Sequence, residues 1–328
     1  MTDLVAADIG GTHARFALAK IGADGAIALG EVQTLRTSEH PSLDAAWETY
    51  RARMDRPLPP AAALAFAGPV ASDKIQLTNN SWHVRLSGLE ERLGVSRLTL
   101  VNDFEAVGHA VARADQEHFL HLAGPDHPLP PHGMVSILGP GTGLGVAHLA
   151  RSAGSGYRVQ ATEGGHIGFA PLDAVEDAIL ARLRERLGRV SVERVVSGPG
   201  IASIYRTLAD LEGRDPPELD DVAIWQGGLS GEDDLAVAAI ERFCLALGSL
   251  AGDIALVQGG FGGVVIAGGL GYRIRETLRG SGFARRFVLK GRYEELMATI
   301  PVKLITHPQP GLFGAAAAFA CEHLETRP

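Results

Sequence analysis

A strand, a tight turn rich in glycine and threonine, and a second strand occur twice in this chain, at residues 4–19 and at residues 134–149. The turns lie at residues 10–12 and 139–143. Glycine lets the main chain turn so that amide groups point into one concavity, which suits phosphate oxygens, and threonine adds a hydroxyl. One such hairpin could equally be an ordinary chain reversal. A second glycine-rich copy costs conformational entropy that an ordinary turn does not require, so it favours a ligand-binding role. The duplication therefore predicts two related α/β halves that face each other across a cleft.

The bulk composition is that of an ordinary globular protein. Its 328 residues, 46% of them hydrophobic and 21% charged, suffice for a sizeable core and suggest two domains. The formal net charge of −8 offers no basic surface for nucleic acid or an anionic membrane, so we expect neither as a partner. Cys244 and Cys321 are too few for a disulfide framework, and the N-terminus lacks the pattern of a signal peptide. We expect a cytoplasmic protein.

A short apolar run, Leu98 to Val101, stops on an amide and a carboxylate, Asn102 and Asp103, before a helical pattern begins. Such a run is typical of a buried strand in an α/β sheet, and ligands usually bind at the carboxyl ends of these strands. Taken alone, Asp103 is better explained as the N-cap of the following helix, because aspartate is a common cap. Motifs elsewhere in the chain change that preference.

Periodicity and capping residues predict the other elements. Ser42 precedes apolar residues at helical spacing, and Ser87 with Glu90 has the spacing of a capping box. The first sheet is expected to continue through residues 26–35 and 62–67, and residues 124–133 have the composition of a surface loop. Further helices are predicted at residues 174–187, 201–211, 237–257 and 310–323, with a buried strand at residues 263–267.

Neither glycine-rich turn ends in the Gly-Lys-Ser/Thr of a Walker P-loop, and no Gly-x-Gly-x-x-Gly opens a helix after a strand. A Rossmann or P-loop fold is therefore disfavoured. Without a loop lysine, a triphosphate would be neutralised by magnesium, main-chain amides and Arg15, so we expect magnesium to be essential. Asp8, at the end of the first strand, could hold a magnesium-bound water.

Another cluster consists of Glu163 and His166, separated by two glycines, with Glu193 further along the chain. Carboxylates and an imidazole are suited to reading hydroxyl groups, and the Gly-Gly pair predicts a constrained turn. A zinc site built from His166 and Glu163 is a weaker alternative, because zinc prefers nitrogen and sulfur ligands and no cysteine lies near in the sequence.

Together these motifs resemble those of bacterial glucokinases, the ATP-dependent hexokinase branch of the actin-like sugar kinase superfamily, nearly from end to end. The matching segments are Asp8-Ile-Gly-Gly-Thr12, Leu77-Thr-Asn79, Asn102-Asp103-Phe104, Gly139-Pro-Gly-Thr-Gly143, Glu163-Gly-Gly-His166, Glu193-Arg-Val-Val-Ser-Gly-Pro-Gly200 and Gly268-Gly-Leu270. The resemblance implies a two-domain, actin-like ATPase (ribonuclease H-like) α/β fold with a cleft between the domains. It further implies a small domain at 1–113 joined by the C-terminal helix 308–328, a large domain at 114–307, and a homodimer.

The resemblance also implies a role for each matching residue in the transfer of the ATP γ-phosphoryl group to the 6-hydroxyl of glucose. Asp103 would be the general base. The sugar contacts would be Asn102, Glu163, His166 and Glu193, with Asn79 as a further candidate. The residues implied at ATP are Asp8 (also at Mg²⁺, through water), Gly10, Gly11, Thr12, Gly139, Gly141, Thr142, Gly143, Gly268 and Gly269. A related group of repressors and kinases carries a cysteine-rich zinc motif after a similar histidine, whereas residues 167–171 here are Ile-Gly-Phe-Ala-Pro, so no zinc is expected.

Two alternatives stay open at this point. The first is a related kinase that acts on another hexose or an amino sugar, or that uses polyphosphate or ADP as the donor. The second is a sugar-sensing regulator on the same fold. That regulator would need a helix-turn-helix ahead of the first strand, which begins near Leu4 and leaves no room for one. An acidic chain adds to this objection.

Overall fold

The computed structural model describes residues 1–68, 73–77, 82–152, 156–215 and 217–325. The chain forms two compact units. Unit 1 comprises Met1–Asp115 and His307–Pro328, and unit 2 comprises Gln116–Thr306.

Unit 1 is built on a six-stranded sheet with the order β3-β2-β1-β5-β8, and β4 also pairs with β2. Strands β1, β5 and β8 are parallel, whereas β2 returns antiparallel to β1. A separate two-stranded sheet joins β6 to β7. The strands are β1 (Thr2–Ile9), β2 (His13–Ile21), β3 (Ile27–Leu29), β4 (Gln33–Arg36), β5 (Ala61–Phe66), β6 (Lys74–Gln76), β7 (His83–Arg85) and β8 (Arg97–Asn102).

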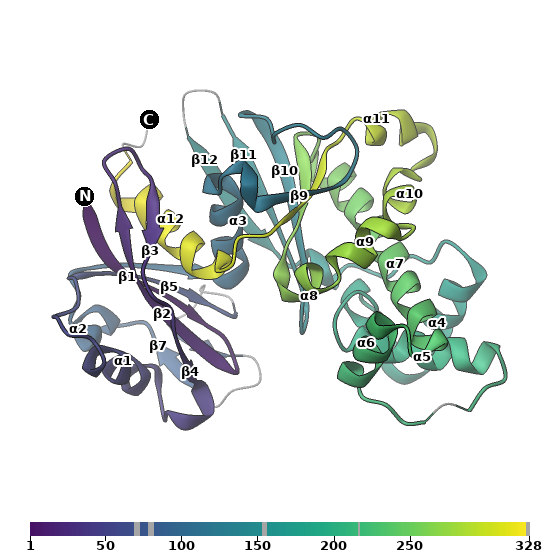
Figure 1. Cartoon of the computed structure of the whole chain (residues 1–328), viewed down its shortest axis with the longest axis horizontal. Helices are drawn as coiled ribbons and strands as arrows, with labels where there is room; N and C mark the ends of the chain where they lie inside the picture. Colours follow the sequence, from purple (N-terminus) through teal and green to yellow (C-terminus); the bar gives the residue numbers. More distant parts are fainter. Residues whose placement is uncertain (69–72, 78–81, 153–155, 216, 326–328) are drawn as a thin grey trace. The chain divides into compact units, whose positions relative to one another are not determined.

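Helices cover both faces of this sheet because alternate residues of β1 point to opposite sides. Val5 and Ala7 belong to the core under α1 (Leu43–Ala52), whereas Leu4 and Ala6 belong to the core under α12 (Pro310–His323). Figure 1 shows α12 lying along β1 although it comes from the other end of the chain, and α12 also packs on α3 (Asp103–Arg113). The C-terminal helix is therefore an integral layer of unit 1.

The prediction that residues 26–35 continue the first sheet is confirmed: they contribute two short strands, β3 and β4, and both pair with β2. One local prediction for unit 1 is corrected by the structure. The capping box at Ser87 is absent: the N-cap of α2 (Leu89–Leu93) is Gly88 in the left-handed region, and the Ser87 hydroxyl donates to Asp73 instead. The prediction at Ser42 is confirmed, since its hydroxyl oxygen accepts a hydrogen bond from the N–H of Ala45 at the start of α1.

Unit 2 contains a six-stranded sheet with the order β12-β11-β10-β13-β14-β9. Strands β10, β13 and β14 are parallel, and β11 returns antiparallel to β10. The hairpin of β10 and β11 therefore stands beside a parallel strand, as the hairpin of β1 and β2 does in unit 1. The strands are β9 (Phe119–Ala123), β10 (Gly133–Pro140), β11 (Leu144–Arg151), β12 (Tyr157–Thr162), β13 (Gly263–Ile266) and β14 (Val302–Ile305).

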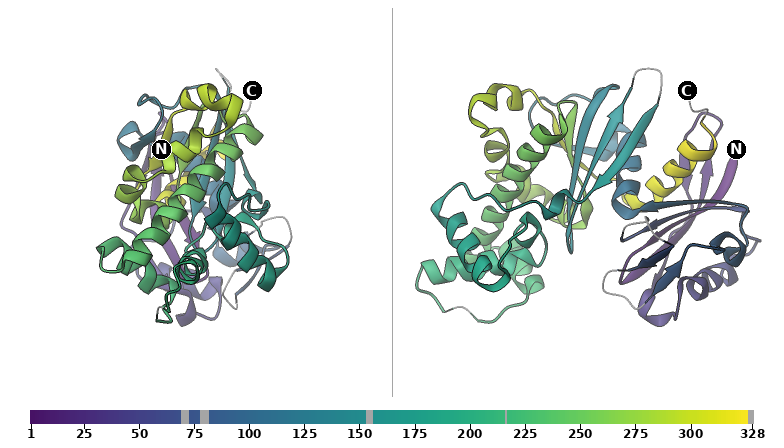
Figure 2. Two further views of the ribbon diagram at one scale, coloured as in Figure 1. Left: turned by 90° about the vertical axis from the view of Figure 1, so that its right-hand side faces the viewer. Right: turned by 180° about the vertical axis from the view of Figure 1, so that it is seen from behind.

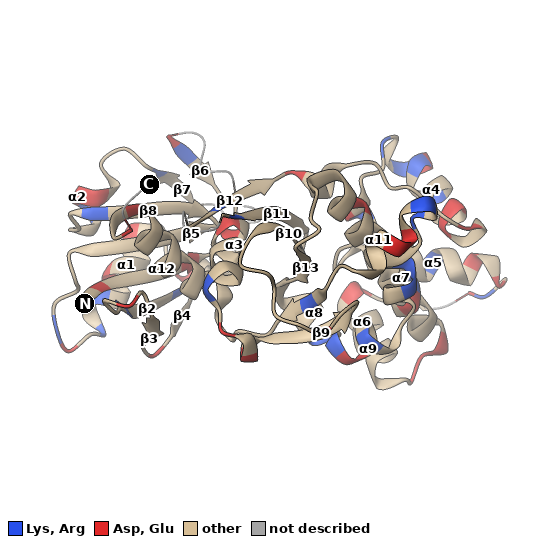
Figure 3. Cartoon of the chain, turned by 90° about the horizontal axis from the view of Figure 1, so that it is seen from above, with Lys and Arg blue, Asp and Glu red and all other residues tan. Residues whose placement is uncertain are grey.

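The helices of unit 2 gather around α7 (Asp234–Gln258), which packs on β10 (Figure 2). Helices α5 (Gly200–Leu211) and α10 (Phe283–Val288) pack against α7. Among the described residues α7 alone is long and apolar enough to cross a membrane, with a mean hydropathy of 1.6. Since 78% of its apolar stretch is buried, it serves as a core helix. The surface helix α4 (Ala174–Leu187) carries acidic residues in its first turn and arginines in its last turn (Figure 3), which complements the helix dipole.

The other elements of unit 2 are mostly short. The helices are α4 (Ala174–Leu187), α5 (Gly200–Leu211), α6 (Asp221–Ser230), α8 (Gly268–Arg273), α9 (Arg275–Gly280), α10 (Phe283–Val288) and α11 (Glu294–Ala298). The 3-10 turns of both units are η1 (Thr37–Glu39), η2 (Gln116–His118), η3 (Gly164–His166), η4 (Val192–Arg194) and η5 (Gly291–Tyr293).

Candidate active site

The Asn102-Asp103 pair of unit 1 lies where β8 passes directly into α3. The N-cap is Asn102 and not Asp103: the Asn102 Oδ1 atom accepts hydrogen bonds from the N–H groups of Phe104 at 2.9 Å and Glu105 at 3.3 Å. The Asn102 Nδ2 atom donates to the carbonyl of Gly68 at 3.0 Å. The capping interpretation of Asp103 is therefore wrong, because the preceding amide performs that task and leaves the carboxylate as the first residue of the helix.

Asp103 is partly buried and electrostatically coupled to Asp8 at the end of β1. Burial raises the pKa of Asp103 to about 6, and the negative charge of Asp8 adds to the rise. A hydrogen bond from the N–H of Phe104, 2.9 Å from Asp103 Oδ1, opposes it. A carboxylate whose pKa lies close to neutral is suited to accept a proton during catalysis.

Asp8 shares its carboxylate with Arg15 across the hairpin. Arg15 Nη1 donates to Asp8 Oδ2 at 3.1 Å, and burial raises the Asp8 pKa while the guanidinium opposes that rise. The first turn of α12 approaches closely, since a Cβ atom on Gly311 would lie 2.8 Å from Asp8 Cγ. Gly311 was not identified from the sequence, because only the packing of α12 brings it to this strand end.

The first glycine-threonine turn follows Asp8 and is held by Thr37 of η1. The Thr37 hydroxyl donates to the Gly11 carbonyl at 2.7 Å, and the Thr37 N–H donates to the Thr12 carbonyl at 3.1 Å. The turn itself is closed by a hydrogen bond from the Gly10 N–H to the His13 carbonyl at 2.9 Å. Thr37 could not be identified from the sequence, because no motif surrounds it.

The second turn, in unit 2, is held in a related way. The N–H of Gly141 donates to the carbonyl of Gly143 at 2.8 Å, and the N–H of Gly198 donates to the carbonyl of Gly141 at 2.7 Å. Gly268, at the start of α8, has a φ of +84° and lies so close that an added Cβ atom would be 2.9 Å from the Pro140 carbonyl. Unit 2 thus brings this turn, Gly268 and the neighbouring Gly269 together.

Glu193 belongs to the same group of residues. Its Oε2 atom accepts a hydrogen bond of 2.9 Å from the N–H of Leu144, directly after the second turn. Glu163 directly precedes η3 and His166 is its last residue. Their side chains are 81% and 56% exposed, with His166 Nε2 3.7 Å from Glu163 Oε2. These two side chains are therefore available to a ligand, whereas one oxygen of Glu193 is already engaged.

The two glycines between Glu163 and His166 allow η3 to pack against β11. A Cβ atom on Gly165 would lie 2.2 Å from the Leu144 carbonyl, and one on Gly164 would lie 2.9 Å from a methyl group of Val146. Arg189 Nη2 donates to the His166 carbonyl at 2.6 Å and fixes the end of the turn. The prediction of a constrained turn is confirmed. Asn79, the remaining candidate sugar contact, lies outside the described residues.

Asp8 is the residue whose chemistry fits magnesium. It is an oxygen donor at a strand end, and a single carboxylate leaves the other positions of an octahedral ion to water and phosphate. The described residues contain no group of three or more His, Cys, Asp or Glu that could enclose a metal by themselves. The donor set therefore suits a magnesium ion that arrives with its own oxygen ligands.

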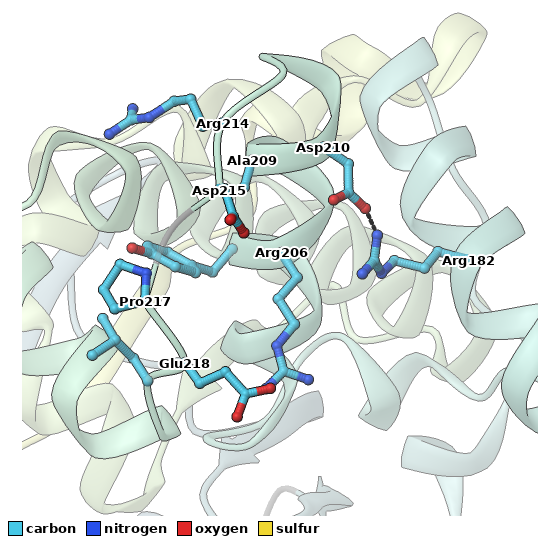
Figure 4. Close-up of a pocket in the computed structure, with 10 residues that line it drawn as sticks. Arg182, Arg206, Ala209, Asp210, Arg214, Asp215, Pro217 and Glu218 are labelled. Atoms are coloured by element: carbon cyan, nitrogen blue, oxygen red, sulfur yellow. Dashed lines mark ion pairs between the residues drawn. The ribbon is translucent and has the colours of Figure 1, made fainter.

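A cavity of about 170 Å³ lies elsewhere in unit 2, between α4, α5 and the segment after α5 (Figure 4). Two of the three arginines that line its described part are paired: Arg182 with Asp210, and Arg214 with Asp234 at 3.0 Å. Neither the glycine-threonine turn nor the Glu163 and His166 turn lines it. We therefore assign the candidate active site to the strand ends and turns described above, in each unit, and not to this cavity.

Comparison with known proteins gives matches over almost the whole chain. The model of the protein family described as Glucokinase matches residues 5–322. A glucokinase of Zymomonas mobilis is 56% identical over 323 residues, covering 98% of this chain and 99% of that protein. The crystal structure of a glucokinase from an Antarctic psychrotroph has a TM-score of 0.87 at 33% identity, covering 98% of this chain and 100% of that one. A ROK family glucokinase from Streptomyces griseus, solved with glucose and AMPPNP, shares the fold at 18% identity and a TM-score of 0.62, covering 96% and 98%.

Proposed function

The chain belongs to the glucokinase family and has its actin-like ATPase fold, and we propose that it transfers the γ-phosphoryl group of ATP to the 6-hydroxyl of glucose. The products are glucose 6-phosphate and ADP. The observation that carries the mechanism is Asp103, a carboxylate at a strand end whose pKa is raised to about 6. Related kinases of known structure bind glucose and an ATP analogue, which supports the same pair of substrates here.

Asp103 is the proposed general base. Phosphoryl transfer has a loose transition state, so alignment of the hydroxyl matters more than strong basicity. As the bond from the sugar oxygen to the γ-phosphorus forms and the bond from that phosphorus to the bridging oxygen breaks, the hydroxyl proton passes to the Asp103 carboxylate. The hydrogen bond between Asp103 Oδ1 and the Phe104 N–H keeps the carboxylate oriented. A positioned base contributes a factor of about 10² to 10⁴ in rate.

The sugar is bound through its other hydroxyl groups. The proposed contacts are Asn102, Glu163, His166, Glu193 and, outside the described residues, Asn79. The Asn102 side-chain oxygen caps α3, and one N–H of its amide donates to the Gly68 carbonyl. The second N–H of the same amide is therefore the group that can donate to a sugar hydroxyl. An epimer or a deoxy sugar would leave one or more of these hydrogen-bonding groups without its hydroxyl partner in the complex, which disfavours that substrate strongly.

The phosphates are bound by the main-chain amides of the two glycine-threonine turns, with Gly268 and Gly269 beside the adenosine. Magnesium bound through water at Asp8 would supply most of the charge neutralisation for the triphosphate. Arg15 contributes positive charge at the same strand end, where it already pairs with Asp8 at 3.1 Å. We extend the proposal to a cytoplasmic, glycolytic homodimer, as the family resemblance implies.

A magnesium-dependent assay of the purified protein with ATP and a panel of hexoses and amino sugars tests this function. We expect glucose to be phosphorylated at least tenfold more efficiently than mannose or fructose, because several hydroxyls are read at once. Equal rates on all three sugars, or a preference for an amino sugar, would favour the alternative of a different sugar kinase. Replacing ATP by polyphosphate or ADP in the same assay identifies the donor.

A further inference from the structure

The peptide group between Gly11 and Thr12 has a fixed orientation. Its carbonyl oxygen accepts a hydrogen bond from the Thr37 hydroxyl at 2.7 Å. In a planar trans peptide the C=O and the following N–H point in opposite directions, so this bond turns the Thr12 N–H away from Thr37. Thr12 is exposed, and its N–H makes no hydrogen bond within the described part of the chain. The Thr12 N–H is thus a main-chain donor with a fixed direction, which points away from Thr37.

In the second turn a hydrogen bond to the corresponding glycine carbonyl fixes the peptide in the same way, but its donor is a main-chain N–H. The carbonyl of Gly141 accepts from the N–H of Gly198 at 2.7 Å, which turns the N–H of Thr142 away by the same peptide geometry. Thr142 is exposed like Thr12, and the order of exposed, intermediate and buried residues is identical at 11–19 and 141–149. In both turns a group from outside the hairpin therefore orients the glycine-threonine peptide.

Thr37 is well placed to hold this orientation rigidly. Its residue is only 2% exposed, and it follows β4, whose Arg36 pairs with His13 in the β2 ladder. The Thr37 N–H donates to the Thr12 carbonyl, and the Thr37 carbonyl accepts from the His40 N–H at 3.2 Å. Both the side chain and the main chain of Thr37 are thus fixed against the turn.

We propose that Thr37 is a positioning residue that aims the Thr12 N–H at a phosphate oxygen of the bound nucleotide. This inference rests on the proposed phosphoryl transfer and adds to it a residue that does not itself touch the substrate. A fixed main-chain donor needs no reorganisation when the phosphate arrives, which is how such groups contribute to binding and rate. Without the Thr37 hydroxyl the Gly11 carbonyl loses its 2.7 Å hydrogen bond, so the orientation of the Gly11-Thr12 peptide, and with it that of the Thr12 N–H, is less tightly fixed.

The matched variants are Thr37→Val, which keeps the shape and removes the hydroxyl, and Thr37→Ser, which keeps the hydroxyl. A control is Thr207→Val in α5, because the buried Thr207 hydroxyl also donates to a main-chain carbonyl at 2.7 Å, that of Ser203. We expect Thr37→Val to raise the KM for ATP about tenfold and to leave the KM for glucose within about twofold. Thr37→Ser and Thr207→Val should keep the KM for ATP of the unmodified protein.

An unchanged KM for ATP in Thr37→Val, or an equal rise in the KM for both substrates, overturns the proposal. So does a Thr37→Ser protein that behaves like Thr37→Val. If Thr37→Val does not fold, the KM for ATP is compared between Thr37→Ala and Thr37→Ser. These two variants both lack the threonine methyl group and differ only in the hydroxyl. A chain with no kinase activity on glucose refutes the proposed function instead. AMPPNP binding measured by calorimetry then still tests Thr37, with a weaker affinity in Thr37→Val expected and an equal affinity contradicting it.

Discussion

The Oε2 atom of Glu193 accepts a 2.9 Å hydrogen bond from the main-chain N–H of Leu144, the residue that follows the second glycine-threonine turn. A Cβ atom on Gly143 would lie 2.7 Å from the same oxygen, so glycine at that position makes room for the carboxylate. One side chain of unit 2 therefore links η4, which carries a proposed sugar contact, to a loop proposed to bind phosphate.

Replacing Glu193 should reveal this double role. In Glu193→Ala the Leu144 N–H loses its acceptor, so we expect the KM values for glucose and for ATP both to rise, each by about tenfold or more. Glu193→Gln keeps an amide oxygen for Leu144 and should raise mainly the KM for glucose. Steady-state kinetics on both variants, with the exposed Glu185→Ala on α4 as a control, make the comparison. A normal KM for ATP in Glu193→Ala would show that the hydrogen bond from the Leu144 N–H to Glu193 does not contribute to ATP binding.

Replacing Asp103 should separate turnover from binding. We expect Asp103→Asn and Asp103→Ala to lower kcat by about 10² to 10⁴ while glucose binding stays measurable by calorimetry. Asp44→Asn, which alters an exposed carboxylate paired with Arg92 on the surface of unit 1, is the control and should be fully active. Near-normal turnover in Asp103→Asn would remove Asp103 from its role as base.

The activity should depend on pH through the Asp103 carboxylate. Because a base acts in its deprotonated form and the Asp103 pKa is raised to about 6, kcat/KM for glucose should fall as the pH drops below 6. The limiting slope is about tenfold per pH unit. A profile measured between about pH 4.5 and 8 checks this expectation. An acid limb that stays near pH 4 would show that Asp103 titrates as an ordinary carboxyl.

The same raised pKa should cost stability at neutral pH. The folded state holds the Asp103 proton more tightly than the unfolded state, whose pKa is near 3.8, so the free energy of unfolding falls as the pH rises from about 4 to about 6. The penalty at pH 7 is roughly 1 to 3 kcal/mol. Asp103→Asn should therefore melt about 2 to 6 °C higher than the unmodified protein at pH 7, with the difference vanishing near pH 4. A lower Tm for the variant at pH 7 would contradict the raised pKa.

Breaking a buried ion pair should lower the free energy of unfolding more than breaking an exposed one. Arg286 of α10 and Glu176 of α4 have side chains only 5% and 2% exposed, and Nη2 lies 3.0 Å from Oε1. Arg286 also pairs with Asp173 at 2.6 Å, whereas Arg286 is the only cation paired with Glu176 among the described residues. Arg286→Ala therefore leaves the Glu176 carboxylate buried without a cation and should lower the free energy of unfolding by about 3 to 5 kcal/mol. In urea unfolding, replacing both residues by methionine should cost less than the single change. Arg51→Ala, at the exposed pair with Glu48, should cost under about 1 kcal/mol.

Much of the local structure could be predicted from the sequence, because it depends on neighbouring residues. The Ser42 cap, the Pro310 start of α12 and the buried helix α7 all agree with the structure. The errors arose where a distant partner outweighed local preference. The Ser87 hydroxyl donates to Asp73, which lies 14 positions away, and does not cap α2. Asn102, whose amide nitrogen donates to the Gly68 carbonyl, caps α3 in place of Asp103.

By itself, the sequence determined the two glycine-threonine hairpins and most of the helices and strands, since these follow from local conformational freedom. It also supplied the candidate reactive residues, whose roles stay predictions. Tertiary structure alone decided which groups orient them. Thr37 reaches Gly11 from 26 positions away, and Glu193 reaches Leu144 from 49 positions away. Such bonds depend on the paired strands and packed 3-10 turns. The entropic cost of closing loops of this length is offset by the interactions of the whole sheet, so no local sequence pattern predicts these bonds.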